Sequence, residues 1–234
     1  MPQRFFVDRG VRVAYLALTL AACKGAPGAV VPAGAAPVSR EQVGQWVGAT
    51  LPREHRLHRF KWLFQDERSS AGGRGSARVA PPDSLRFDVA GPFGSGAAAA
   101  AVIGDQPLWA EPPDAVKKLV PNYPLMWAMF GIARQPADGE ALRGVSQGPV
   151  TAWQYAGASD TVSYVRTAGR QVKLVTEVRH AGEMVGRAET TLDSAGAPLT
   201  ARLVVPSVPA KLKLTFLSTS RADFAPEIWT DRKP

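Results

Sequence analysis

Apolar and polar residues alternate along most of the chain after residue 52, and this period of two is typical of β-strands that bury one face. The first run places His58, Phe60 and Trp62 on one face and the cations Arg59 and Lys61 on the other. Because the connections between runs are short, we expect neighbouring strands to be antiparallel. The runs predict about eleven strands, at residues 58–64, 74–80, 85–89, 97–103, 108–111, 153–155, 162–164, 172–178, 188–192, 201–205 and 212–216.

The segments between these runs predict turns and one linker. Gly72 and Gly73 are expected to form a turn, as are residues 81–83 and the glycine-rich segment 91–96. Residues 135–148 are polar and predict a linker that leads into the later strands.

Three segments carry helical spacing instead. Ser39 is a candidate N-cap with Gln42 three residues on, ahead of apolar residues at helical spacing, which predicts a helix over 39–50. Residues 115–120 predict a second helix. The run LMWAMFGI, residues 125–132, is too apolar for a surface helix and too short to span a membrane, so it must be covered by protein.

A sheet this large with one apolar face will curl, and the central helices are the available cover for that face. We therefore expect residues 39–234 to form a single domain, a curled sheet with helices set in its mouth. The space between sheet and helices is either core or cavity.

The start of the chain has a different composition. Arg4, Arg9 and Arg12 precede the uncharged, Leu- and Ala-rich run 13–22, so residues 1–22 have the layout of a bacterial signal peptide. Residues 24–38 carry one charge and are almost entirely Gly, Ala, Pro and Val, which predicts a flexible tether over 23–38.

The only cysteine, Cys23, ends the signal-like segment and has no disulfide partner. Leu20, Ala21, Ala22 and Cys23 resemble the lipobox of bacterial lipoproteins. The resemblance implies that Cys23 receives a diacylglyceryl group, becomes the first mature residue and anchors the chain to a membrane. In many Gram-negative bacteria, Asp directly after the lipidated cysteine retains a lipoprotein in the inner membrane. This chain has Lys24 there, which favours the outer membrane, with the domain facing the periplasm. The alternative is a soluble exported protein with a cysteine near its cleavage site.

The formal net charge of +8 falls to +6 without residues 1–22, because three arginines and one aspartate leave. No run of five basic residues and no nucleic-acid motif is present, so a nucleic-acid partner is not expected. A mild affinity for anionic lipid head groups is a more natural use of the charge.

Enzymatic chemistry has little support. His55, His58 and His180 lack metal-ligand spacing, and there is no second cysteine, so neither a metal nor another cofactor is predicted. Nucleophile-elbow, Walker and dinucleotide motifs are absent. The acids Asp66 and Asp88 flank strands and are expected to be solvated. We therefore expect a binding protein and no enzyme.

The order of several segments resembles the superfamily of the lipoprotein carrier LolA and its outer-membrane acceptor LolB. These segments are LRFDVAGPFGS, IGDQPLWAEP, the helical PLMWAMFGI and the late AKLKLTFLSTSRADFAPEIW. The resemblance covers most of residues 39–229. It implies a mainly β (α+β) fold: a curled, unclosed antiparallel β-barrel of about eleven strands with a helical lid or plug.

The resemblance also implies a hydrophobic cavity that binds acyl chains of phospholipid or lipoprotein without covalent chemistry. Its alternative is a filled core, and each candidate side chain fits either description. Met and aromatic side chains adapt to irregular apolar ligands. The candidates are Phe60, Trp62, Phe64, Leu85, Phe87, Val89, Trp153, Tyr155, Leu174, Leu212, Leu214 and Phe216 on the sheet, and Leu125, Met126, Trp127, Met129, Phe130 and Ile132 on the helix.

Two further features of the family bear on this chain. The membrane-delivery loop of LolB corresponds to 91–96, which makes Phe93 its exposed apolar residue; the alternative is a Phe folded under the turn. The lid-locking arginine of LolA cannot be placed, because many arginines could serve. A different function for the same fold is a structural or regulatory envelope lipoprotein that binds a protein partner.

Overall fold

The computed structural model describes residues 31–32, 34–91, 96–113, 122–207 and 209–230. Cys23 and the predicted signal peptide lie outside the described residues, as do Phe93 and the predicted helix at 115–120.

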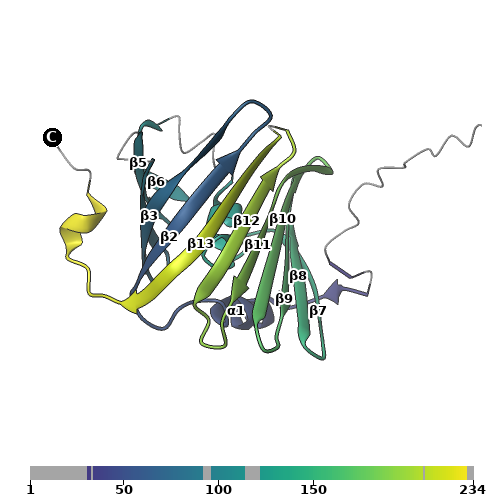
Figure 1. The fold of residues 1–234 in the computed structure, drawn as a ribbon. Coiled ribbons are helices and arrows are strands. Elements are labelled where there is room, and N and C mark those ends of the chain that lie inside the picture. The colour runs from purple at the N-terminus through teal and green to yellow at the C-terminus, as the bar shows by residue number, and fades with distance from the viewer. Residues whose placement is uncertain (1–30, 33, 92–95, 114–121, 208, 231–234) are drawn as a thin grey trace, which may run out of the picture.

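One antiparallel sheet of thirteen strands runs through the described chain and curls without closing (Figure 1). The strand order is β1-β7-β8-β9-β10-β11-β12-β13-β2-β3-β4-β5-β6, so β1 and β6 are its two edges. The strands are β1 (Ala36–Pro37), β2 (Arg56–Gln65), β3 (Ser70–Ala80), β4 (Ser84–Ala90), β5 (Ala97–Ile103), β6 (Gln106–Glu111), β7 (Ala141–Gln147), β8 (Val150–Ala156), β9 (Asp160–Thr167), β10 (Val172–His180), β11 (Glu183–Leu192), β12 (Pro198–Val205) and β13 (Ala210–Arg221).

The structure has two more strands than the alternation predicts, and both lie at one edge. The predicted linker at 135–148 is wrong over its second half, because β7 occupies Ala141–Gln147 and pairs with β8. The two-residue β1 pairs with β7 in turn. Only the two-residue β1 lies beyond β7, and most β7 side chains are exposed or half-buried, so β7 lacks the apolar alternation of the central strands.

The predicted turn at Gly72 and Gly73 is also wrong, because both residues lie inside β3. The chain turns four residues earlier, where Asp66 accepts hydrogen bonds from the backbone N–H groups of Arg68 (2.8 Å) and Ser69 (2.6 Å). A Cβ at position 73 would lie 1.9 Å from the carbonyl oxygen of Ala90. Glycine is therefore present for close strand contact and not for a turn.

The predicted N-terminal helix is confirmed as α1 (Arg40–Gly48). Ser39 Oγ caps it by accepting a hydrogen bond from the N–H of Gln42 at 3.2 Å. Val43 and Val47 are fully buried and join a cluster on the concave face of β8 to β10.

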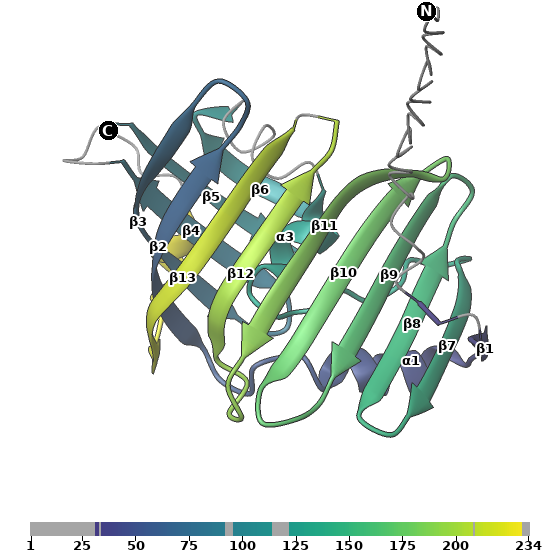
Figure 2. The same ribbon diagram turned by 45° about the vertical axis from the view of Figure 1, so that its right-hand side comes forward.

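The apolar run after Asn122 is covered, as its composition predicts. It begins with the short helix α3 (Tyr123–Ala128) and continues through tight turns to Ile132. Leu125 and Trp127 are at most 1% exposed. The curled sheet surrounds α3, while α1 lies along the ends of β7 to β10 (Figure 2). None of the helices in the described residues is long and apolar enough to cross a membrane.

Candidate apolar binding site

A cavity of about 70 Å³ lies between the concave face of the sheet and the α3 segment. Strands β2, β4 and β13 form one wall, and α3 with the turn after it forms the other. All of its lining side chains are apolar: Phe60, Trp62, Phe87, Val89, Leu212, Leu214, Met126, Met129 and Phe130.

Aromatic rings close one end of the cavity. The ring of Phe130, at the end of the helical run, lies 6.3 Å from Phe60 and 6.1 Å from Phe216, both edge-on. His58 joins this cluster, with its ring 5.7 Å from Phe216. Edge-to-face contacts at these distances favour a defined arrangement over free repacking.

The glycines of β3 let this wall form. Gly75 is opposite both Phe60 and Val89, and a Cβ there would lie 2.6 Å from the Phe60 ring. The ring of Phe60 therefore rests on bare backbone. Beside it, the indole N–H of Trp62 donates to the carbonyl oxygen of Ala90 at 3.1 Å, which satisfies the one polar group that the Trp62 side chain carries.

The size of the cavity limits what it holds in this conformation. An engineered apolar cavity of about 150 Å³ admits one benzene, so a space of about 70 Å³ admits only a short piece of hydrocarbon. A longer chain requires the α3 wall to move outward. Met126 and Met129 lie on that wall, and their unbranched side chains can repack around such a chain.

Arg134 fastens the α3 wall to the turn between β5 and β6. Its guanidinium lies 4.8 Å from the centroid of the Trp127 ring, and its Nε is 3.2 Å from Asp105 Oδ1. The indole N–H of Trp127 donates to the carbonyl oxygen of Gly104 at 2.9 Å. These contacts connect the buried helix to the β5–β6 edge of the curled sheet.

The backbone of Arg134 is held at the same time by the second aromatic cluster. Its N–H donates to Tyr164 Oη at 3.2 Å, and its carbonyl oxygen accepts from Tyr155 Oη at 2.8 Å. Burial raises the pKa of both phenols, so they remain neutral donors and acceptors. No local pattern could single out Arg134, because its partners come from distant strands.

His58 is a titratable group that packs against the aromatic end of the cavity. It is 2% exposed, and its Nδ1 lies 2.9 Å from Thr219 Oγ1. Burial, and secondarily the Arg56 cation, lower the pKa of His58 to about 4. The imidazole is therefore neutral near pH 7 and adds no charge to the apolar wall.

The structure brings together nine of the residues that sequence reasoning placed in a cavity. Leu85, Leu125, Trp127 and Ile132 are in the same core but are fully packed, and Phe216 packs beside them. Phe64 is half-buried near the end of β2. Trp153, Tyr155 and Leu174 belong to the separate cluster beneath α1.

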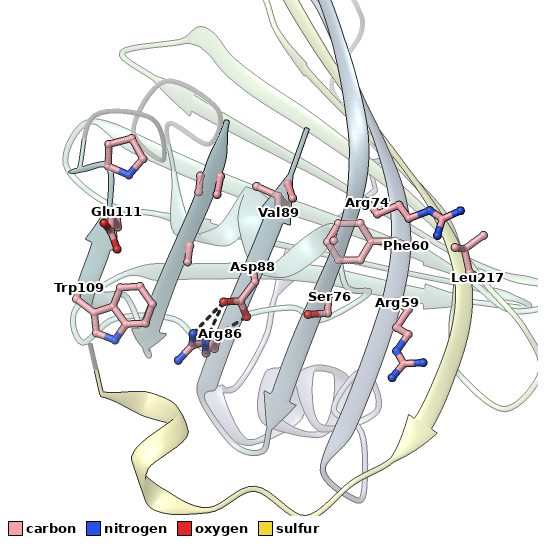
Figure 3. Close-up of a pocket in the computed structure, with 16 residues that line it drawn as sticks. Arg59, Phe60, Arg74, Ser76, Arg86, Asp88, Val89, Trp109, Glu111 and Leu217 are labelled. Atoms are coloured by element: carbon pink, nitrogen blue, oxygen red, sulfur yellow. Dashed lines mark hydrogen bonds and ion pairs between the residues drawn. The ribbon is translucent and has the colours of Figure 1, made fainter. Parts of the chain in front are cut away.

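The outer face of the sheet carries a wider groove that sequence reasoning missed. It has a volume of about 710 Å³ over β2 to β6, beside Trp109, Arg86 and Asp88 (Figure 3). Arg86 is 3% exposed because a C-terminal 3₁₀ turn, η2 (Pro226–Trp229), covers it. Its Nη1 donates to the carbonyl oxygen of Ile228 at 2.6 Å and its Nη2 lies 2.9 Å from Asp88 Oδ1.

Asp88 is also 2.7 Å from Arg78, so the prediction of a solvated Asp88 is wrong. The Arg86 guanidinium lies 4.9 Å from the Trp109 ring centroid. Among the described residues, no group of three or more His, Cys, Asp or Glu side chains is arranged to hold a metal ion.

No protein-family model and no curated protein matches the sequence. A solved LolA superfamily protein from Nitrosomonas europaea is 11% identical, with 83% of this chain and 98% of that chain covered and a TM-score of 0.48. An outer membrane lipoprotein-sorting protein domain from Vibrio parahaemolyticus is 10% identical, with 81% and 96% covered and a TM-score of 0.51. The MucA/MucB complex of Pseudomonas aeruginosa is 14% identical, with 82% and 60% covered and a TM-score of 0.33.

The match to the Vibrio domain concerns the fold, since so few residues are shared. The match extends over nearly the whole of that domain. The sheet has thirteen strands where the sequence predicts about eleven, and the two additional strands are β1 and β7. This chain thus shares the fold of the Vibrio domain, with an unclosed antiparallel sheet curled around a short apolar helix.

Proposed function

We propose that this protein is a non-catalytic envelope lipoprotein that binds acyl chains of lipid or lipoprotein between the sheet and α3. The observation that carries the proposal is the cavity lined by nine apolar side chains and closed by one short helical segment. Such a site offers a hydrocarbon chain burial without any polar group to desolvate. The lipoprotein-sorting domain from Vibrio with the same fold supports this proposal.

Binding requires the α3 wall to open. The wall is held by side-chain contacts of Trp127 and Arg134 and by the hydrogen bond from Thr190 Oγ1 to the carbonyl oxygen of Ala128 at 2.6 Å. These are few and local compared with the strand pairing around them. A bound chain would replace the contacts that Met126 and Met129 make with the sheet.

The anchor is a separate part of the proposal. Lipidation of Cys23 would hold the domain at the periplasmic face of the outer membrane on a tether that ends before β1 (Ala36–Pro37). The test is Cys23→Ala followed by membrane fractionation. Retention of the variant in the membrane fraction would show that the cysteine is not the anchor.

Uptake of a fluorescent fatty acid tests the cavity. The chain from Val31 onward, purified without detergent, is titrated with the probe and also weighed by native mass spectrometry for co-purified lipid. Val89→Phe fills the cavity and should weaken uptake by roughly tenfold, about 1.4 kcal/mol. Val185→Phe is the matched control, because Val185 is also half-buried against this core but does not line the cavity.

Equal uptake by the two variants would contradict the proposed site. A chain that carries no lipid and takes up no probe would favour the second function, an envelope scaffold for a protein partner. The outer groove of about 710 Å³ is the observation that favours that alternative.

A further inference from the structure

Four adjacent strands at the middle of the sheet carry positive charge without any negative charge. Strands β12, β13, β2 and β3 are neighbours in that order. Their sequences contain no Asp or Glu. They contain nine cations: Arg56, Arg59, Lys61, Arg74, Arg78, Arg202, Lys211, Lys213 and Arg221.

Six of these cations form one exposed surface, which we call the basic face. Within the described residues, none of the six has a carboxylate within ion-pair distance, whereas Arg78 and Arg221 do. The register places them on the outer side of the sheet, opposite the core face that Phe60 and Leu214 occupy. The basic face consists of Arg59, Lys61, Arg74, Arg202, Lys211 and Lys213.

The strand register sets like charges directly against each other. Lys61 is the cross-strand partner of Arg74, and Lys213 is the partner of Arg202. Direct like-charge pairs in an antiparallel sheet are destabilising. The fold thus tolerates a cost here, because no carboxylate of the described residues bridges either pair in the way that Asp88 bridges the facing Arg78 and Arg86 on β3 and β4.

Two of the acids that border this face already have partners. On β11, Glu189 is opposite Arg202, but its carboxylate lies 3.2 Å from Lys173 and 3.1 Å from Arg187. On β4, Asp88 is held by Arg78 and Arg86. Two more, Asp66 and Glu67, lie in the turn beside Lys211 and form no ion pair with the face among the described residues. The charge of the basic face is therefore left for something outside the domain.

Two large apolar side chains lie within the same face. Leu63 is the cross-strand partner of Lys213 and is 39% exposed, and Leu217 is 54% exposed at the bulge of β13. Figure 3 shows Leu217 on β13 near Arg59 and Arg74. Given strand and residue spacings, the face is about 15 Å wide and 20 Å long. Cations around exposed leucines are the composition of an interfacial membrane surface.

We propose that the basic face docks on an anionic phospholipid membrane, with its cations at lipid phosphates and Leu63 and Leu217 among the head groups. The charge complementarity carries this assignment, and the exposed leucines favour a lipid surface over a purely polar acidic partner. The docking site lies on the opposite side of the sheet from the cavity and does not depend on it.

The experiment measures partition of residues 24–234 onto vesicles, so that neither an acyl anchor on Cys23 nor the basic and apolar segment 1–22 contributes. Vesicles of phosphatidylcholine with about a quarter phosphatidylglycerol are compared with pure phosphatidylcholine. The parent should prefer the anionic vesicles. That preference should weaken as salt rises from about 0.01 M to 0.15 M, where screening shortens from roughly 30 to 8 Å.

Removing two cations locates the site. Lys61→Gln with Lys213→Gln should lower partition onto anionic vesicles by roughly 25-fold, since each basic residue near such a surface contributes about fivefold. The matched control, Arg53→Gln with Arg170→Gln, changes the net charge equally at exposed positions outside the face and should change partition by less than about twofold. Unfolding midpoints confirm that both pairs fold.

Three outcomes would overturn the proposal. The parent could bind neutral and anionic vesicles equally, or the two double variants could lose equal affinity. In the third, the parent would bind polyglutamate but no vesicle, which would assign the face to an acidic polypeptide.

Discussion

The guanidinium of Arg134 stacks on the Trp127 ring at 4.8 Å while its Nε faces Asp105 at 3.2 Å. This side chain is 15% exposed, so the stacking contributes more than the half-exposed ion pair. Arg134→Ala should lower the free energy of unfolding by about 1 to 2 kcal/mol. Hydrogen exchange should also speed up selectively at the amides of 127–132.

Asp105→Asn is the control for that change. It removes the ion pair and keeps the stacked guanidinium, so its effect on exchange at 127–132 should be small. If both variants exchange alike, or if Arg134→Ala changes only global unfolding, Arg134 does not hold the α3 wall.

Acidification should destabilise the protein through His58. Its folded pKa is about 4, against an ordinary value of 6.5, so between these values the unfolded chain binds the proton and the folded chain does not. Stability from this group is therefore present above pH 6.5 and is lost as the pH falls towards 4, by about 3 kcal/mol.

Urea unfolding at pH 7 and pH 4 checks this for the parent and His58→Gln. The variant should be less stable at pH 7, because it loses the ring contacts with Phe130 and Phe216. Between pH 7 and pH 4, the free energy of unfolding of the variant should fall by less than that of the parent. An equal pH dependence in both proteins would show that another group is responsible.

Glycine at position 73 is required by strand contact. Gly73→Ala would put a Cβ 1.9 Å from the Ala90 carbonyl oxygen and should destabilise by about 3 kcal/mol. In Gly44→Ala, nothing lies within 4 Å of the new Cβ on α1, and helix propensity should add about 0.5 to 1 kcal/mol. Urea midpoints of the two variants should move in opposite directions. A tolerated Gly73→Ala would mean that the β3 and β4 backbones separate easily.

The core face of the sheet was predictable because apolar side chains recur at every second position within each strand, and tertiary packing preserves that period. Phe60 on β2, Phe87 on β4 and Leu214 on β13 are examples. The errors occurred where pairing overrides local preference. The Gly72-Gly73 pair favours a turn, yet Gly73 lies within β3. The backbone at Ala90 approaches it so closely that a side chain would not fit. Asp88 alternates as a solvent-facing residue, yet it pairs with Arg86, which a segment 142 positions later covers.

The cavity itself was only partly predictable. Its residues are apolar in sequence whether they form core or cavity, so Leu85 and Val89 cannot be distinguished before the α3 wall is positioned. Trp153 and Tyr155 show the same limit, because α1 covers that part of the sheet and gives it a core of its own. Arg134 has no local signal, since its partners Trp127 and Asp105 meet it only in the folded chain.

The like-charge pair of Lys61 and Arg74 allows stability to be separated from surface function. Lys61→Gln removes the repulsion and should raise the free energy of unfolding by about 0.2 to 1 kcal/mol. Arg78→Gln, on the same outer face of β3, instead breaks a 2.7 Å ion pair with Asp88 and should lower it by about 1 kcal/mol. Urea unfolding of both variants measures the two signs. A destabilised Lys61→Gln would show that Lys61 has a stabilising role within the fold, whereas a stabilised one shows that the domain retains this lysine at a cost that folding alone does not explain.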